Sequence, residues 1–269
     1  MEFVSVALIL AQKSCPFYGG GFPTLIAMIS MFFVTSVGAG AASPLQSVLS
    51  AILLTGVIVF SVGMTFLLSR VLSATILKGL PSSFILELPP YRKPQIGKTI
   101  IRSVCDRTFS VLVRALSVAA PAGLVIWLLA NSSIGGVSLL SHAAGFLDPF
   151  GRLLGMDGVI LLAFILGLPA NEIVIPIMIM AYLSRGTLAS FDSLTALKTL
   201  LVSNGWTWLT AVSVMLFSLM HWPCSTTLMT IRKETESLKW TVVSFLVPTL
   251  TGIAICLIFA TVVRWAGVV

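Results

Sequence analysis

An acid and an amide lie between two prolines inside a long apolar run. The run covers residues 159–183, and its central stretch GLPANEIVIP contains Pro169, Asn171, Glu172 and Pro176. About 20 apolar residues are enough for a helix to cross a bilayer, and Glu172 is the only charged residue in this run. Because a carboxylate at membrane depth costs roughly 2.5 kcal/mol or more, an acid in such a place indicates a functional site.

The two prolines predict a break in the helix. A proline has no backbone N–H, so the carbonyl four residues earlier loses its helical donor. Pro169 is expected to release the carbonyl of Ile165, and Pro176 that of Glu172. Transporters use broken helices of this kind to coordinate cations. The alternative is a kinked helix in which Glu172 pairs with a neighbouring serine or threonine.

A second break interrupts the apolar sequence at HWPCSTT, residues 221–227. His221 and Cys224 are three residues apart and share a face if the turn stays helical. Imidazole and thiolate are suitable ligands for borderline divalent metals such as Fe2+. Pro223 is expected to shape this break. His221 and Cys224 together predict part of a metal path. The alternative is an ordinary helix end with a buried thiol.

Cys15 lies in a third breaker-rich segment, residues 13–23, which contains three glycines and two prolines. These residues exclude a continuous helix there. The segment is either a re-entrant loop that presents Cys15 or an ordinary surface turn. The other cysteines form no CxxC pair with it, so the sequence supports neither a zinc ribbon nor a disulfide framework.

The elements that must position these residues are membrane helices. The chain has 269 residues, of which 57% are hydrophobic and only 9% charged, whereas about a quarter of the residues of a soluble domain are charged. We therefore expect an all-α, polytopic helical membrane protein with about six to eight membrane segments, some of them broken or re-entrant. The net charge of +7 comes from basic residues beside apolar runs, which is typical of membrane orientation and not of nucleic-acid binding.

Three regions follow along the chain. Residues 1–69 hold two to three membrane segments, with spans expected at 22–37 and 45–68. Residues 70–112 form a basic connector, of which 95–112 is expected to lie as an amphipathic helix on the membrane or as a solvated linker. Residues 113–269 form the second membrane domain, with spans expected at 113–130, 159–183, 197–220 and 241–263, a Gly- and Ser-rich outer loop at 131–157 that carries His142, and a solvated loop from Arg232.

Loop charges predict the sidedness. Residues 70–107 contain seven basic residues against two acidic ones, which places this connector in the cytoplasm. If the run 159–183 crossed once, the basic loop at 232–239 would lie outside. A re-entrant turn at the proline break would return that loop to the cytoplasm, so the charges favour a hairpin.

Common enzyme motifs are missing from the sequence. It contains no GxxxxGK[ST] phosphate loop, no HExxH pattern and no recognisable Ser-His-Asp set. The residues therefore favour a transporter over an enzyme.

Four motifs resemble the membrane part of the ferrous iron transport protein B family of bacteria. They are ELPPYRKP at 87–94, GLPANE at 167–172, HWPCSTT at 221–227 and RKET at 232–235, in the family's order and near its spacing. The resemblance implies a multi-pass permease for Fe2+ in the bacterial cytoplasmic membrane. It also implies two gate regions, with a remnant of the first in residues 1–69 and the second in residues 113–269.

The resemblance also assigns the site. It puts Cys224 on the cysteine of the second gate, Cys15 on that of the first, and Asn171 and Glu172 on the family's Asn-Glu pair. After Cys15 the sequence PFYGGG departs from the family pattern. Family members carry a GTP-binding domain, which this sequence does not include.

Several partners follow from these considerations. Fe2+ is expected as the transported ion and membrane lipid as the surroundings, while GTP would act only through a separate domain or chain. A GTP-binding chain or a full-length transporter is the expected protein partner, and a homo-oligomer is compatible with the sequence. Two alternatives stay open, namely a non-transporting accessory subunit that docks on such a partner, and a gate-family transporter for nucleosides.

Overall fold

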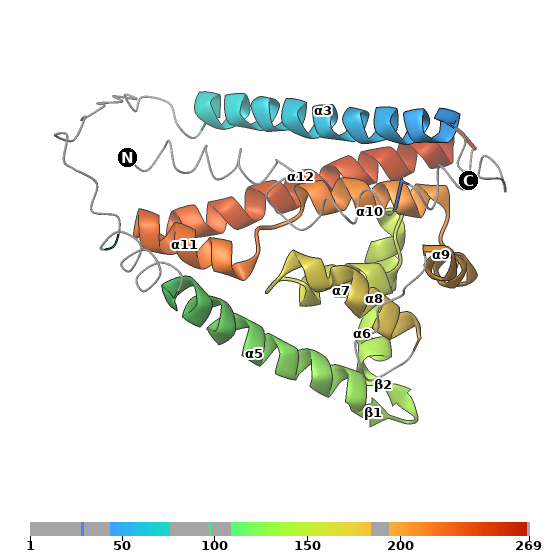
Figure 1. Cartoon of the computed structure of the whole chain (residues 1–269), viewed down its shortest axis with the longest axis horizontal. Coiled ribbons are helices and arrows are strands. Elements are labelled where there is room, and N and C mark those ends of the chain that lie inside the picture. The colour runs from blue at the N-terminus through green and yellow to red at the C-terminus, as the bar shows by residue number, and fades with distance from the viewer. Residues whose placement is uncertain (1–27, 30–43, 76–96, 98–108, 184–193, 268–269) are drawn as a thin grey trace.

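A computed structural model describes residues 28–29, 44–75, 97, 109–183 and 194–267 of the chain. Almost all of these residues are helical, and the two short strands form one antiparallel hairpin (Figure 1). The expectations for Cys15, for the span at 22–37 and for most of the basic connector fall outside the described residues.

The described elements are helices of very different length and two short strands. They are α3 (Pro44–Thr75), α5 (Phe109–Asn131), β1 (Ser133–Ile134), β2 (Val137–Ser138), α6 (Leu139–Leu153), α7 (Gly158–Leu166), η3 (Asn171–Ile173), α8 (Val174–Tyr182), α9 (Leu194–Ser203), α10 (Trp208–Met220), α11 (Ser225–Thr235) and α12 (Leu238–Trp265).

Three stretches among the described residues are long and apolar enough to cross a membrane. They are Ala51–Leu68 in α3, Trp208–Lys233 across α10 and α11, and Leu238–Trp265, which is α12. Helices α6 and α7 together would make a fourth, but they meet at a bend of 108°. The polytopic helical fold predicted from composition is thus confirmed, and helices cover the spans expected at 45–68, 113–130 and 241–263.

The helices that flank the basic segments end on the same side of the molecule. In Figure 1 the last residues of α3, the first residues of α5 and the corner between α11 and α12 all lie to the left. The β1–β2 hairpin and α9 lie to the right. Helix α5 ends and helix α10 begins on this right-hand side. The helices α6, α7 and α8 between them are therefore compatible with a re-entrant path.

The expectation of a loop at residues 131–157 is wrong, because most of this segment is helical. After the β1–β2 hairpin, α6 begins behind Ser138, whose hydroxyl accepts the backbone N–H of Ser141 at 3.2 Å. The apolar residues of α6 recur at helical spacing, and two of them, Leu140 and Ala144, are buried. The Gly and Ser content of the segment hid this periodicity. His142 is exposed on α6, with Nδ1 3.1 Å from the carbonyl oxygen of Ser138.

Two further expectations about helix ends are wrong. The run 197–220 is two helices, because Gly205 turns the chain with a φ of +85° and Thr207 then caps α10 through the N–H of Thr210. The loop expected from Arg232 is still part of α11, which ends only at Thr235. Thr235 is 2% exposed and donates its hydroxyl to the carbonyl of Ile231 at 2.8 Å, so this helix end is packed and not solvated.

Helices α6 and α7 pack closely because two glycines face backbone. A Cβ on Gly158 would lie 2.0 Å from the carbonyl oxygen of Ala144, and one on Gly151 would lie 2.6 Å from the backbone of Asp157. Backbone atoms cannot swing aside as a flexible side chain does, so the sharp bend of this pair depends on both glycines. Gly252 similarly lets α12 approach Met220 at the end of α10.

Gly158→Ala tests this contact. Because the added methyl meets backbone, we expect the free energy of unfolding in detergent to fall by about 3 kcal/mol, the upper range for overpacking. Gly145→Ala is the matched control, since this glycine lies on α6 with nothing within 4 Å of the added carbon. Equal thermal stability of the two variants would contradict the close approach.

Candidate functional site

The first helix break lies between α7 and α8. Helix α7 ends at Leu166 with Gly167 as its C-cap, and the chain then runs through residues 168–170 before the short helix η3 and the start of α8. A Cβ on Gly167 would lie 2.4 Å from the side chain of Val174 and 3.0 Å from the carbonyl oxygen of Ala163. The break expected at the GLPANE motif is therefore present, and a glycine permits its tight turn.

The backbone of this break differs from the expectation based on its prolines. The carbonyl of Ile165 accepts the N–H of Leu168 at 3.3 Å, so the prediction that Pro169 leaves it without a donor is wrong. Pro176 is the third residue of α8, where a backbone N–H has no helical acceptor in any case. Pro176 is therefore a residue of the first helical turn and does not interrupt a helix.

The second break lies between α10 and α11, as the HWPCSTT motif predicts. Helix α10 ends at Met220, His221 is extended, and Cys224 is the residue before α11, with φ −61° and ψ 155°. The Cys224 sulfur lies 3.1 Å from the hydroxyl of Thr226 and 3.0 Å from that of Thr227. Pro223 is buried and lies in the segment between these two helices.

Backbone and side-chain hydrogen bonds join the two breaks. The N–H and the hydroxyl of Ser225 both donate to the carbonyl oxygen of Leu168, each at 2.9 Å, across 57 residues of sequence. Leu168 lies in the first break and Ser225 begins the helix after the second. The two helix breaks, 167–170 and 221–224, are therefore in direct contact through Leu168 and Ser225, and this contact is called the joint below.

His221 lies four residues before Ser225, is surrounded by aromatic rings and is 3% exposed. Its ring centroid is 5.3 Å from Phe164, 6.1 Å from Phe217 and 6.0 Å from Trp222. Its Nδ1 lies 2.8 Å from the carbonyl oxygen of Ser218, which can only accept. A neutral ring therefore carries its proton on Nδ1 and its lone pair on Nε2.

Asn171 is the first residue of η3, and its side-chain oxygen is buried without a hydrogen-bond partner among the described residues. The backbone of Glu172 lies in the same helix, and its side chain is outside the described part of the structure. Within the described residues, no group of three or more His, Cys, Asp or Glu is arranged to hold a metal ion. The structure thus joins the two predicted breaks, while a complete ligand set stays a prediction.

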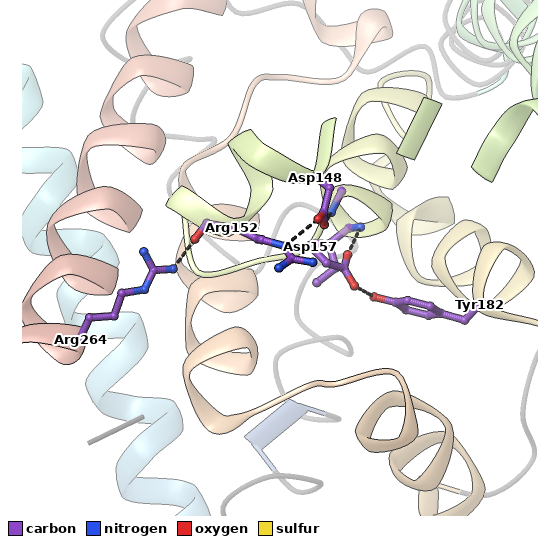
Figure 2. Close-up of polar contacts among 7 residues, drawn as sticks. Asp148, Arg152, Asp157, Tyr182 and Arg264 are labelled. Atoms are coloured by element: carbon purple, nitrogen blue, oxygen red, sulfur yellow. Dashed lines mark hydrogen bonds and ion pairs between the residues drawn. The ribbon is translucent and has the colours of Figure 1, made fainter. Parts of the chain in front are cut away.

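Other polar residues at the ends of these helices were not anticipated. Asp157 caps α7, accepts the hydroxyl of Tyr182 and lies near Asp148 and Arg152 (Figure 2). An aspartate directly before an apolar run is a helix-start signal, so Asp157 could have been found from sequence. Ser225 gave no such signal, because its acceptor is a distant backbone carbonyl.

Two family models match parts of the chain. The Gate family, described as nucleoside recognition, matches residues 112–238, which include both breaks. The model described as ferrous iron transport protein B C terminus matches residues 54–107. No solved structure matches the chain.

Curated relatives match most of this chain but only a part of themselves. The chain is 32% identical over 212 residues to the "Fe(2+) transporter FeoB" of Staphylococcus aureus strain MSSA476, which covers 75% of this chain and 30% of the relative. The same name belongs to relatives from Synechocystis, 28% identical over 68% of this chain and 29% of the relative, and from Leptospira biflexa, 26% identical over 72% and 30%. The chain thus spans less than a third of the length of these relatives.

The fold is that of a helical membrane protein with two helix breaks in contact, and its residues 112–238 are similar to the Gate family. The resemblance seen in its motifs is confirmed by the comparisons. The chain is similar to the C-terminal membrane portion of ferrous iron transport protein B.

Ser225→Pro tests the joint between the breaks. Proline is favoured at the first position of a helix, and the extended Cys224 before it is compatible with proline, but both donors to Leu168 are lost. We expect a loss of about 2 kcal/mol in the free energy of unfolding, from two hydrogen bonds of about 1 kcal/mol each.

Leu238→Pro is the matched control, because Leu238 also begins a helix after an extended residue and is 63% exposed. Its thermal unfolding midpoint should stay near that of the parent protein. Equal midpoints for the two proline variants would contradict a stabilising role for the joint.

Proposed function

We propose that the chain is the membrane portion of an Fe2+ permease and that the ion passes at the joined breaks. The observation that carries the proposal is the pair of hydrogen bonds from Ser225 to the carbonyl of Leu168. Irregular backbone is tolerated at membrane depth where protein encloses it or where it lines a polar path. The iron-transporter names of the relatives support Fe2+ as the substrate.

The side chains around the joint offer suitable ligand atoms for Fe2+. The buried side-chain oxygen of Asn171 lacks a donor among the described residues, and such an oxygen is costly unless something compensates it. A passing cation would supply that compensation. Cys224 adds a sulfur, His221 an imidazole nitrogen and Glu172 a carboxylate, and mixed N, O and S ligands suit a borderline divalent metal.

The proposed orientation puts the basic connector at 70–112 in the cytoplasm of a bacterium, with the chain in the cytoplasmic membrane. The ends of α3 and α5 that adjoin this connector lie on the same side as the α11–α12 corner, which carries Arg232, Lys233 and Lys239. All these basic residues then face one compartment, as the positive-inside rule requires. A GTP-binding domain or chain would act from this side, as either an energy source or a docking partner.

Fe2+ uptake by cells tests the proposed path. The full chain is expressed with a GTP-binding partner, and initial uptake of radiolabelled Fe2+ is measured for Cys224→Ser, Asn171→Ala and Glu172→Gln. Each variant removes one proposed ligand, so we expect uptake to fall about tenfold or more, by analogy with the loss of groups that support a metal site.

Cys256→Ser is the matched control for Cys224→Ser. Cys256 is fully buried in α12 and its thiol donates to the carbonyl of Ser213 at 3.6 Å, away from the breaks. The Cys256→Ser variant should transport Fe2+ at the parental rate when equal amounts of protein reach the membrane. Parental uptake in all three ligand variants would overturn the proposed path, while capture of a GTP-binding partner without any uptake would favour the accessory-subunit alternative.

Nucleoside transport is a second candidate, because the family model that covers both breaks is described as nucleoside recognition. Proteoliposomes containing the purified protein together with the GTP-binding partner and GTP separate the two substrates in one experiment. The iron proposal predicts flux of radiolabelled Fe2+ and none of radiolabelled uridine or adenosine above protein-free vesicles. Nucleoside flux without Fe2+ flux would replace the iron proposal.

A further inference from the structure

Three side chains form a continuous hydrogen-bonded chain at the start of α7. Asp157 accepts the backbone N–H of Ile160 at 2.7 Å through one carboxylate oxygen, and so caps the helix. The hydroxyl of Tyr182 donates to the other oxygen, as Figure 2 shows. Trp206 donates its indole N–H to the same hydroxyl at 2.8 Å. These three residues, termed the DYW chain below, join segments that lie 25 and 24 residues apart in sequence.

The DYW chain holds the far ends of both helices that flank the first break. Helix α7 begins behind Asp157, and α8 ends at Tyr182. Between these two ends lie Leu168 and Asn171 of the candidate path. The third member, Trp206, lies in the turn just before α10 and is 4% exposed. The DYW chain therefore also links α7 to α10, the helix that leads to the second break.

Helix α7 is therefore held at both ends by groups from other elements. At its start the DYW chain acts together with Asp148, whose carboxylate accepts the N–H of Gly158 at 3.1 Å. Past its last residue, the carbonyl of Leu168 is held by Ser225. A helix of nine residues is a rod of roughly 14 Å, so Asp157 and the carbonyl of Leu168 lie just beyond the two ends of one helix.

A second set of contacts braces the same corner. Arg152 pairs with Asp148, with its Nε 2.6 Å from a carboxylate oxygen, and Arg264 of α12 donates to the backbone carbonyl of Arg152 (Figure 2). Helix α12 is thus bound to the end of α6, and α6 is bound to the start of α7 through Asp148. Side-chain networks with every member satisfied rigidify the elements that they join.

We propose that Asp157 and Tyr182 are positioning residues of the ion path. They set the place of α7, and through it the place of the Leu168 carbonyl and of Asn171, without touching the ion. This role rests on the proposed Fe2+ transport. A site held by supporting hydrogen bonds loses performance when those bonds are lost, even if its own ligands remain.

The test measures two properties of each variant in membranes. One is Fe2+ uptake with its maximal rate and half-saturating concentration. The other is the rate at which N-ethylmaleimide labels Cys224, read from the Cys224 peptide by mass spectrometry, which needs no transport. Tyr182→Phe removes only the linking hydroxyl, and Asp157→Ala removes the cap and the acceptor together. Asp157→Asn keeps an oxygen for the cap and offers an amide N–H that the Tyr182 oxygen can accept, so the link is kept with its direction reversed.

Ser138→Ala is the matched control. Ser138 caps α6 just as Asp157 caps α7, but its hydroxyl bonds to Ser141 in the first turn of α6 itself. It reports what the loss of a helix cap does by itself. Each variant is compared at equal amounts of folded protein in the membrane, so that a general loss of stability does not count as a transport effect.

We expect Tyr182→Phe and Asp157→Ala to lower the maximal uptake rate about fivefold, the effect typical of one lost hydrogen bond, with an equally large change in the labelling rate of Cys224. Asp157→Asn and Ser138→Ala should stay within about twofold of the parent. Parental labelling and uptake in Tyr182→Phe and Asp157→Ala would overturn the positioning role. Altered labelling in these two variants, in a parent protein that moves no Fe2+, would uphold it and refute the proposed substrate.

Discussion

The carbonyl of Leu168 with its two donors from Ser225 is the interaction on which the rest of the site depends. A chain that leaves helical geometry inside an apolar domain must satisfy its backbone groups within the protein, because lipid offers them no partners. Two breaks that each needed partners find them in one another, at 2.9 Å for both bonds. The geometry that the breaks require is thus also what places Asn171 and Cys224 in one region.

Close packing surrounds the contact between the two breaks. Glycines at positions 151 and 158 let α6 and α7 approach backbone to backbone, and Gly252 does the same for α12 against Met220. Aromatic rings of Phe164, Phe217 and Trp222 surround His221 and fix its ring beside the end of α10. Close packing of this kind transmits small displacements, since a dense interior has few voids to absorb them.

The sequence predicted the parts of this architecture that depend on local chemistry. Continuous apolar runs marked α3, α5 and α12, and proline-rich motifs marked both breaks. It failed where a weak local signal competed with tertiary packing. The Gly- and Ser-rich composition of 131–157 concealed the helix α6, and the single Gly205 was not enough to divide α9 from α10. The bond between Leu168 and Ser225 joins residues 57 positions apart, and such a pairing has no local signature.

In the proposed function, the joined breaks bind Fe2+ on its way through the membrane. Iron K-edge X-ray absorption of the purified protein loaded anaerobically with Fe2+ tests it most directly, because the spectrum distinguishes sulfur from oxygen and nitrogen ligands. We expect a sulfur ligand that is lost in Cys224→Ser and kept in Cys256→Ser. An iron shell of oxygen and nitrogen alone, identical in the parent and both variants, would contradict it.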